Sequence, residues 1–385
     1  MTRRDLIAGA AASGLGAVAA PRAAHAADAS ASWPLWEAYA RRFLSKEGRV
    51  IDFSADDITT SEGQSYALFF ALVANDRTRF DRLLAWTNEN LAGGQLGEQL
   101  PAWLWGKDDG GRWGVRDPNS ASDSDVWIAY TLLEAGRLWQ EPGLTLIGRN
   151  LAAAAGLREV RRLRGLGSTL LPGSEGFNPS PGVYQLNASY LPLQLILRLA
   201  EAADASPWSR VARSTPAVIQ GSSRNGFVLD WVAYWEQQES FRDAPLPRPE
   251  AKASYDAIRV YLWGGMLDPK TPGRDDILAA MSGMERSLLA NDVPPAEVLA
   301  DGRVKDPHGG VGFSAAVAPF LASLGREQAA QRQLRRVKEA FDSTTGLYGD
   351  TPKYYDQNLI LFALGWTEGR FRFTPGGALR ARGLS

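Results

Sequence analysis

The chain has 385 residues, 45% hydrophobic and 22% charged, so it is long enough to bury a large core. Its 42 basic and 43 acidic residues nearly balance, which argues against nucleic acid or an anionic membrane as a partner. Cysteine is absent, which excludes thiol nucleophiles and thiolate metal sites.

The first 26 residues have the features of an export signal. The paired Arg3 and Arg4 precede an apolar stretch rich in Ala and Gly, and small residues up to Ala26 are typical of a signal-peptidase site. The arginine pair favours a twin-arginine signal, with a Sec signal as the alternative. The stretch is too short to span a membrane. We therefore expect no stable membrane insertion and a mature chain, residues 27–385, that is periplasmic or secreted.

Removal of this signal leaves His308 as the only histidine. The sequence around it, Pro307-His308-Gly309-Gly310, matches neither a Ser-His-Asp triad nor a zinc site. The acidic pair Asp108-Asp109 lacks the ligand spacing and the closing Glu of an EF-hand loop. We predict no metal and no other cofactor, and the chemistry that remains is that of carboxylates.

Hydrophobic periodicity predicts about twelve helices and an all-α fold. The segments are 33–46, 62–75, 77–92, 122–139, 142–157, 187–203, 205–220, 252–266, 274–290, 310–324, 326–342 and 355–367. Uniformly apolar segments alternate with amphipathic ones. This is expected when the helices of an inner ring are buried on all sides and each helix of an outer ring has one solvent-exposed face. This pattern predicts a single domain, an (α/α)6 barrel with long substrate-lining loops. Short strands are expected in the loops 158–186 and 223–250.

Carboxylates open three of the most apolar helical segments, namely Glu62, Asp123 and Asp256. Ser61-Glu62-Gly63-Gln64 has the pattern of a capping box. One such acid is explained by the helix dipole. Three at a common spacing predict acids gathered at one end of the barrel, where one serves as a protonated acid and another as an ionised base.

Aromatic and polar side chains occur in the loops that lead to the same end. Aromatic rings stack on the flat faces of sugars, and amide or guanidinium groups bind their hydroxyls. The candidates for sugar binding are Trp105, Tyr184, Asn187, Tyr190, Tyr255, Arg259 and Tyr355. The alternative role for Arg259 is to form a structural ion pair with an acidic side chain instead of binding sugar.

The stretch 121–139, Ala-Ser-Asp-Ser-Asp-Val-Trp-Ile-Ala-Tyr-Thr-Leu-Leu-Glu-Ala-Gly-Arg-Leu-Trp, resembles the signature of the family 8 glycoside hydrolases. Ser124 departs from it, since Ala or Gly is usual there. The segments at 61–66, 186–190, 254–259 and 354–358 are similar to that family's acid, base and substrate-lining segments. The resemblance covers the mature chain and is greatest to the periplasmic endoglucanases of bacterial cellulose-synthesis systems.

The resemblance implies an (α/α)6 barrel that hydrolyses β-1,4-glucan with inversion. Glu62 would protonate the leaving oxygen, Asp256 would deprotonate the attacking water, and Asp123 would hold the sugar at the cleavage point. It also implies components of a cellulose synthase complex as partners. Two alternatives stay open. One is the same mechanism on xylan, mixed-linkage glucan or chitosan, and the other is a non-catalytic glucan-binding component of the secretion assembly.

Overall fold

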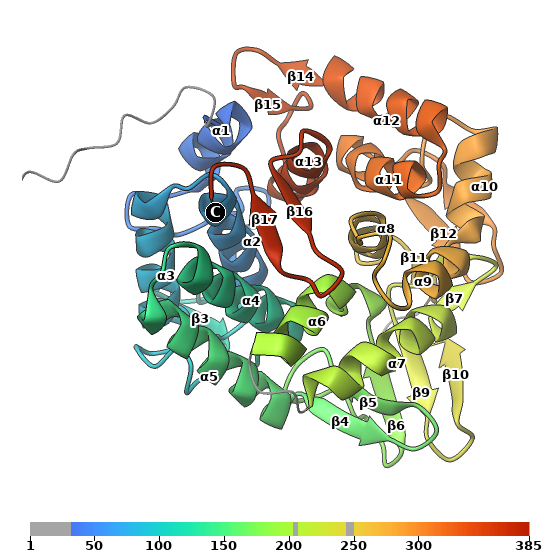
Figure 1. Cartoon of the computed structure of the whole chain (residues 1–385), viewed down its shortest axis with the longest axis horizontal. Coiled ribbons are helices and arrows are strands. Elements are labelled where there is room, and N and C mark those ends of the chain that lie inside the picture. The colour runs from blue at the N-terminus through green and yellow to red at the C-terminus, as the bar shows by residue number, and fades with distance from the viewer. Residues whose placement is uncertain (1–31, 203–206, 244–249, 385) are drawn as a thin grey trace, which may run out of the picture. The chain divides into compact units, whose positions relative to one another are not determined.

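Helices form two concentric rings in the computed structural model, which describes residues 32–202, 207–243 and 250–384 (Figure 1). The predicted export signal lies outside the described residues. The inner ring consists of α2 (Ser61–Val73), α4 (Ser122–Leu138), α6 (Leu193–Ala202), α8 (Ile258–Gly265), α11 (Val311–Ser323) and α13 (Tyr354–Thr367). The outer ring consists of α1 (Pro34–Phe43), α3 (Arg77–Leu91), α5 (Pro142–Arg158), α7 (Trp208–Gly221), α9 (Arg274–Ala280), α10 (Ser282–Ala290) and α12 (Glu327–Glu339).

The division into rings follows from the sequence pattern. Nearly every residue of α2, α4 and α8 is buried, because these helices are apolar all round and pack against protein on all sides. The outer helix α12 buries only one face, with Ala329, Ala330, Gln333 and Val337 turned inward. The predicted (α/α)6 barrel is confirmed. Within the described ranges, every helix is too short or too polar to span a bilayer.

Small antiparallel sheets form in the loops. The three-stranded sheets are β1 (Thr59–Thr60), β2 (Leu104–Lys107) and β3 (Trp113–Asp117); β6 (Val183–Leu186), β9 (Val232–Trp235) and β10 (Ser240–Asp243); and β11 (Lys252–Ala253), β12 (Glu297–Leu299) and β13 (Val304–Asp306). The hairpins are β4 (Val160–Leu163) with β5 (Gly167–Leu170), β7 (Ser223–Arg224) with β8 (Phe227–Val228), β14 (Phe341–Asp342) with β15 (Leu347–Tyr348), and β16 (Phe371–Phe373) with β17 (Leu379–Ala381). The strands expected in loops 158–186 and 223–250 are confirmed, whereas the other sheets were not predicted.

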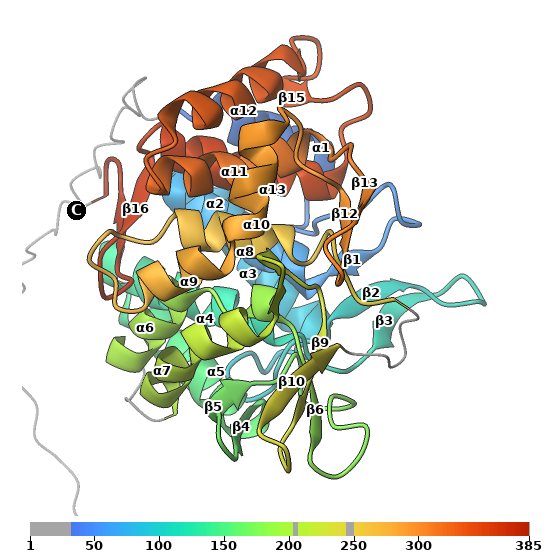
Figure 2. The same cartoon turned by 90° about the vertical axis from the view of Figure 1, so that its right-hand side faces the viewer.

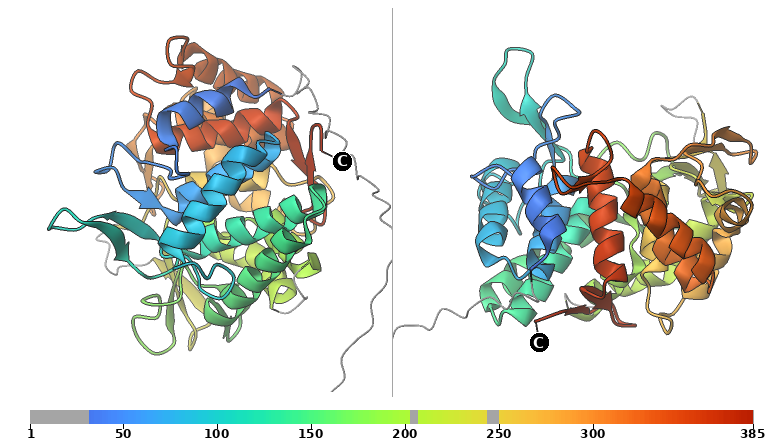
Figure 3. Two further views of the ribbon diagram at one scale, coloured as in Figure 1. Left: turned by 90° about the vertical axis from the view of Figure 1, so that its left-hand side faces the viewer. Right: turned by 90° about the horizontal axis from the view of Figure 1, so that it is seen from above.

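The C-terminal hairpin β16–β17 closes one end of the barrel. Buried Glu134 accepts a hydrogen bond from the backbone N–H of Leu379 at 2.8 Å, and Tyr130 donates to the carbonyl of Gly377, also at 2.8 Å. Gly377 has φ +84°, and a Cβ there would lie 1.7 Å from the carbonyl oxygen of Gln194, so only glycine fits. The hairpin β2–β3 projects from the opposite end (Figures 2 and 3).

Three predicted helices have different bounds in the structure. Segment 187–203 divides into a 3₁₀ turn (Ala188–Tyr190) and α6, because Pro192 cannot continue the first turn. In segment 252–266 the helix begins only at Ile258, because Lys252–Ala253 is extended and pairs with β12. Segment 274–290 breaks at Met281 into α9 and α10.

The predicted capping box at the start of α2 is wrong. Thr60 is the N-cap, and its side chain accepts from the backbone N–H of Gly63 at 3.1 Å, while the Ser61 hydroxyl is buried without a hydrogen-bond partner. The Gln64 side chain does not bond back to the cap. Its carbonyl accepts from the N–H of Val50 at 2.6 Å, so tertiary partners have replaced the local one.

Candidate active site

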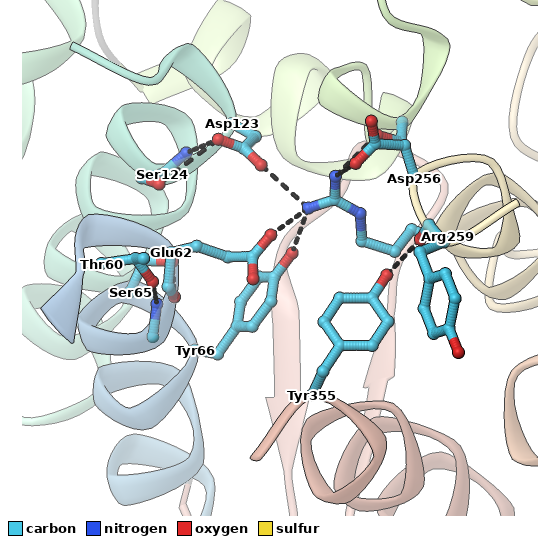
Figure 4. A network of polar contacts seen from close by, with 12 residues as sticks. Thr60, Glu62, Ser65, Tyr66, Asp123, Ser124, Asp256, Arg259 and Tyr355 are labelled. Atoms are coloured by element: carbon cyan, nitrogen blue, oxygen red, sulfur yellow. Dashed lines mark hydrogen bonds and ion pairs between the residues drawn. The ribbon is translucent and has the colours of Figure 1, made fainter. Parts of the chain in front are cut away.

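Three carboxylates from three inner-ring segments converge on one guanidinium (Figure 4). Glu62 lies in the first turn of α2 and Asp123 in the first turn of α4, while Asp256 lies in the turn that precedes α8. The Nη1 atom of Arg259 donates to Glu62 and, at 3.0 Å, to Oδ2 of Asp123. Its Nη2 atom donates to Oδ1 of Asp256 at 3.1 Å. We refer to these four residues as the Arg259 cluster.

Arg259 lies at the bottom of this cluster. Its side chain is 2% exposed, whereas those of Glu62 and Asp256 are 22% and 28% exposed, and that of Asp123 is 5% exposed. Arg259 also donates to the hydroxyls of Tyr66, at 3.2 Å, and Ser189, at 3.0 Å. A planar guanidinium suits this task, because it presents several donors in fixed directions and stays charged when buried. It therefore holds the carboxylates together while two of them remain accessible from solvent.

Glu62 has the electrostatics of a general acid. Burial raises the pKa of its carboxyl to about 7, and the negative charges of Asp123 and Asp256 act in the same direction. Arg259 opposes them and keeps the rise smaller than burial alone would produce. Burial also raises the pKa of Asp123, against the stabilising charge of Arg259 and the hydrogen bond from the N–H of Ser124. Near neutral pH, a substantial fraction of Glu62 therefore carries a proton that it can donate.

Hydrogen-bond donors hold the carboxyl of Asp256 on both of its oxygens. Its Oδ2 atom accepts from the indole N–H of Trp231 at 2.9 Å and from the side-chain amide of Asn187 at 3.2 Å, while Oδ1 accepts from Arg259. Donors of this kind stabilise a negative charge and fix the orientation of the carboxylate. Glu62 and Asp256 therefore differ in environment, as an acid and a base must.

The structure places most of the predicted sugar-binding residues beside the cluster. Asn187 contacts Asp256, and the ring of Tyr190 lies 5.5 Å from the guanidinium carbon of Arg259. Tyr355, in the first turn of α13, donates its hydroxyl to the carbonyl of Tyr255. Tyr255 is 53% exposed, an unusual fraction for a large aromatic residue. Their sugar-binding roles stay predictions.

Trp105 and Tyr184 lie in the small sheets instead. The Trp105 ring stacks on Trp113 at 4.9 Å and meets Trp86 edge-on at 5.3 Å, so the more exposed indole of the β2–β3 hairpin is that of Trp113. Tyr184 is on β6, opposite Tyr234 of β9. Trp105 packs on neighbouring indoles and Tyr184 packs against the core, and their role in stacking on sugars stays a prediction.

Trp231, Tyr66 and Ser189 belong to the site but were not predicted from the sequence. Tyr66 follows Glu62 by one helical turn, so the spacing alone could have indicated it. Ser189 is two residues from Asn187 and donates to its side-chain oxygen at 2.7 Å. Trp231 lies in a loop without periodicity, and only the tertiary structure brings it to Asp256. Among the described residues, no group of His, Asp and Glu side chains has the arrangement of a metal site.

A helical barrel with a buried acid and a second, hydrogen-bonded carboxylate at one end has the constellation of a glycoside hydrolase. The sequence profile of the glycosyl hydrolases family 8 matches residues 16–369, and the chain therefore belongs to this family. Two curated relatives are named endoglucanase. The protein of Xanthomonas axonopodis pv. citri (strain 306) is 43% identical over 98% of this chain and 97% of its own. That of Salmonella typhi is 45% identical over 92% of each.

The solved structures agree with this family. The crystal structure of an endo-1,4-D-glucanase from Vibrio fischeri ES114 superposes with a TM-score of 0.81. It is 38% identical in sequence and covers 91% of this chain and 99% of its own. The chain is thus an enzyme, a glycoside hydrolase.

Proposed function

We propose that this enzyme is an endo-β-1,4-glucanase that hydrolyses cellulose or a related β-1,4-glucan with inversion at the anomeric carbon. In this mechanism Glu62 protonates the leaving oxygen, and Asp256 deprotonates the water that attacks from the other face of the sugar. The observation that carries the proposal is the Arg259 cluster, in which one guanidinium joins Glu62, whose pKa is raised, to Asp256, which hydrogen-bond donors orient. The relatives named endoglucanase support the choice of substrate.

Membership of the glycosyl hydrolases family 8 supports inversion. Glu62 and Asp256 accept hydrogen bonds from different nitrogens of Arg259, Nη1 and Nη2. An inverting enzyme needs roughly 6.5–9.5 Å between them to admit a water molecule, whereas a retaining enzyme needs only about 5–5.5 Å.

Asp123 has a supporting role in this proposal. Its Oδ1 atom accepts from the N–H of Ser124 at 2.8 Å and its Oδ2 atom from Arg259, so the carboxylate is held on both sides. A fixed carboxylate of this kind binds sugar hydroxyls at the cleavage point and orients the attacking water. Tyr190, Tyr355 and Trp105 provide stacking faces, and Tyr184 and Tyr255 complete the set that lines the glucan. Asn187 and Arg259 are buried and act on the glucan through the carboxylates that they hold.

The proposal is tested by the products of the purified mature enzyme. We expect it to release new reducing ends from carboxymethyl cellulose, and proton NMR of the first product to show the α-anomer. Xylan, mixed-linkage glucan and chitosan are assayed in parallel. If the enzyme cleaves only one of these polysaccharides and not carboxymethyl cellulose, the proposed substrate is wrong and the proposed mechanism still stands. A β-anomer as the first product would contradict inversion. Binding of glucan without cleavage would mean that the protein is a non-catalytic component.

We expect the activity to fall as pH rises through about 7, because Glu62 must be protonated to act and its pKa is raised to about 7. At lower pH the acid is fully protonated, so this cause of loss disappears. The measurement is kcat/KM for carboxymethyl cellulose from mildly acidic to mildly alkaline pH. A rate that stays flat through neutral pH and falls only in strongly alkaline solution would contradict the assignment of Glu62.

We further propose that the enzyme is exported through its N-terminal signal and acts on glucan beside a cellulose synthase complex. The paired arginines, the short apolar stretch and the small residues before position 27 support export. A fusion of residues 1–26 to a reporter that functions only outside the cytoplasm tests this step. Replacement of Arg3 and Arg4 by lysine is expected to block export if the twin-arginine route is used, and to leave it intact if the Sec route is used.

A further inference from the structure

A buried aspartate outside the Arg259 cluster binds the turn that carries the proposed base. Asp230 is 5% exposed and lies in the loop between β8 and β9. Its Oδ1 atom accepts from the backbone N–H of Ser254 at 2.8 Å and from that of Ala257 at 2.9 Å. Its Oδ2 atom accepts from the Ser254 hydroxyl. These donors stand on either side of Asp256, at positions 254 and 257.

The main chain of Asp230 joins the same segment, since its N–H donates to the carbonyl of Lys252 at 2.8 Å. The loop that contains Asp230 is thus hydrogen-bonded to Lys252, just before the turn 254–257, and to residues within that turn. An ionised carboxylate accepts hydrogen bonds and donates none, so it matches a set made only of donors. Burial and the charge of Asp256 raise the pKa of Asp230 to about 6, which leaves it mainly ionised at neutral pH.

The next residue, Trp231, holds the side chain of Asp256. Its indole N–H donates to Oδ2 at 2.9 Å, and its ring stacks on Phe177 with centroids 6.0 Å apart and planes 7° from parallel. Two consecutive residues therefore control the base at two levels. Asp230 sets the backbone of the turn, and Trp231 sets the direction of the carboxylate.

We infer that Asp230 is a positioning residue for the base, which fixes the turn 254–257 so that Asp256 meets the attacking water in line. The inference rests on the proposed function of Asp256. The turn needs such support because α8 begins only at Ile258, and its N-cap, Ala257, has no side chain that could cap the helix. Asp230 supplies from a distant loop the acceptors that a local cap would have supplied.

The test compares Asp230→Ala with Asp230→Asn on carboxymethyl cellulose, or on the parallel polysaccharide that the wild type cleaves. Without the acceptors the turn shifts, and a misplacement of about 1 Å lowers kcat by about 100-fold. We expect that loss for Asp230→Ala, with KM close to that of the wild type, because the sugar-binding residues stay in place. Asn keeps an oxygen for the two backbone N–H groups and should restore most of kcat.

Asp342→Ala is the matched control. Asp342 also accepts from two backbone N–H groups, of Thr344 and Thr345, and from the Thr345 hydroxyl, but it does so in the β14–β15 hairpin. We expect its kcat to be unchanged. All rates are measured well below each variant's Tm and per folded molecule, so that a loss of stability alone does not lower them.

Several outcomes would overturn the inference. They are a kcat of Asp230→Ala equal to that of the Asp342→Ala control, a change in KM alone, and a loss in Asp230→Asn as large as that in Asp230→Ala. If Asp230→Ala does not fold, Ser254→Ala removes one of the three bonds and must still lower kcat at constant KM. A wild type that cleaves none of the polysaccharides would instead overturn the proposed function, and the inference with it.

Discussion

Asp256→Asn is expected to lower kcat by about 10²–10⁴-fold, the range that general base catalysis contributes. Asn has the same shape and keeps one oxygen for its neighbours, so the turn and the contact to Trp231 should persist. It cannot take a proton from water, and therefore the loss should appear in kcat rather than in KM. The measurement is the initial rate of reducing-end release from carboxymethyl cellulose, with binding of cellopentaose as the control for substrate affinity.

Glu62→Gln should lose activity to a similar extent on carboxymethyl cellulose, but for a different reason, which a second substrate separates. A 2,4-dinitrophenyl β-cellobioside has a leaving group that needs no protonation. We expect Glu62→Gln to hydrolyse this substrate at much of the wild-type rate, because the general acid is then dispensable. Asp256→Asn should remain as impaired on it as on carboxymethyl cellulose, because the general base is still needed.

The exposed Glu327, in the first turn of the outer helix α12, serves as the control acid, and Glu327→Gln should match the wild type. Activity that survives both Glu62→Gln and Asp256→Asn would show that other carboxylates carry the reaction.

Arg259→Met is expected to lower the free energy of unfolding by about 3–5 kcal/mol at mildly alkaline pH, since it leaves buried carboxylates without their counter-charge. Arg259 lowers the pKa of Glu62 and of Asp123, so its removal raises both. Raised pKa values mean that the folded state binds protons more tightly than the unfolded state does. Stability is then retained at low pH and lost as pH rises.

The loss should therefore be larger at about pH 8 than at about pH 5, where protonation relieves the unpaired charges. Urea unfolding at the two pH values measures it. Arg77→Met is the control, because Arg77 pairs with Asp81 and Glu141 at the surface and surface ion pairs contribute only about 0–1 kcal/mol. A destabilisation that is equal at both pH values would show that Arg259 acts by packing rather than by charge.

Much of the fold could be predicted from hydrophobic pattern. The apolar run from Tyr66 to Val73 and the run that follows Asp123 each mark a buried inner helix, and their bounds hold within about two residues. Two of the failures share a cause. The start of α8 and the partners of Gln64 depend on contacts between residues far apart in sequence, and such contacts override local preference. The break at Pro192 is local by contrast, because proline cannot continue the preceding turn.

The sequence by itself determined the ring architecture and the three acids at one end of the barrel, because helix periodicity and helix-start signals are local properties. Only the tertiary structure decided how those acids differ. A single buried guanidinium, on a side chain that equally suited a sugar contact, joins Glu62, Asp123 and Asp256. Burial, which no local pattern measures, raises the pKa of Glu62, and a loop 25 residues before Asp256 supplies the indole that orients it.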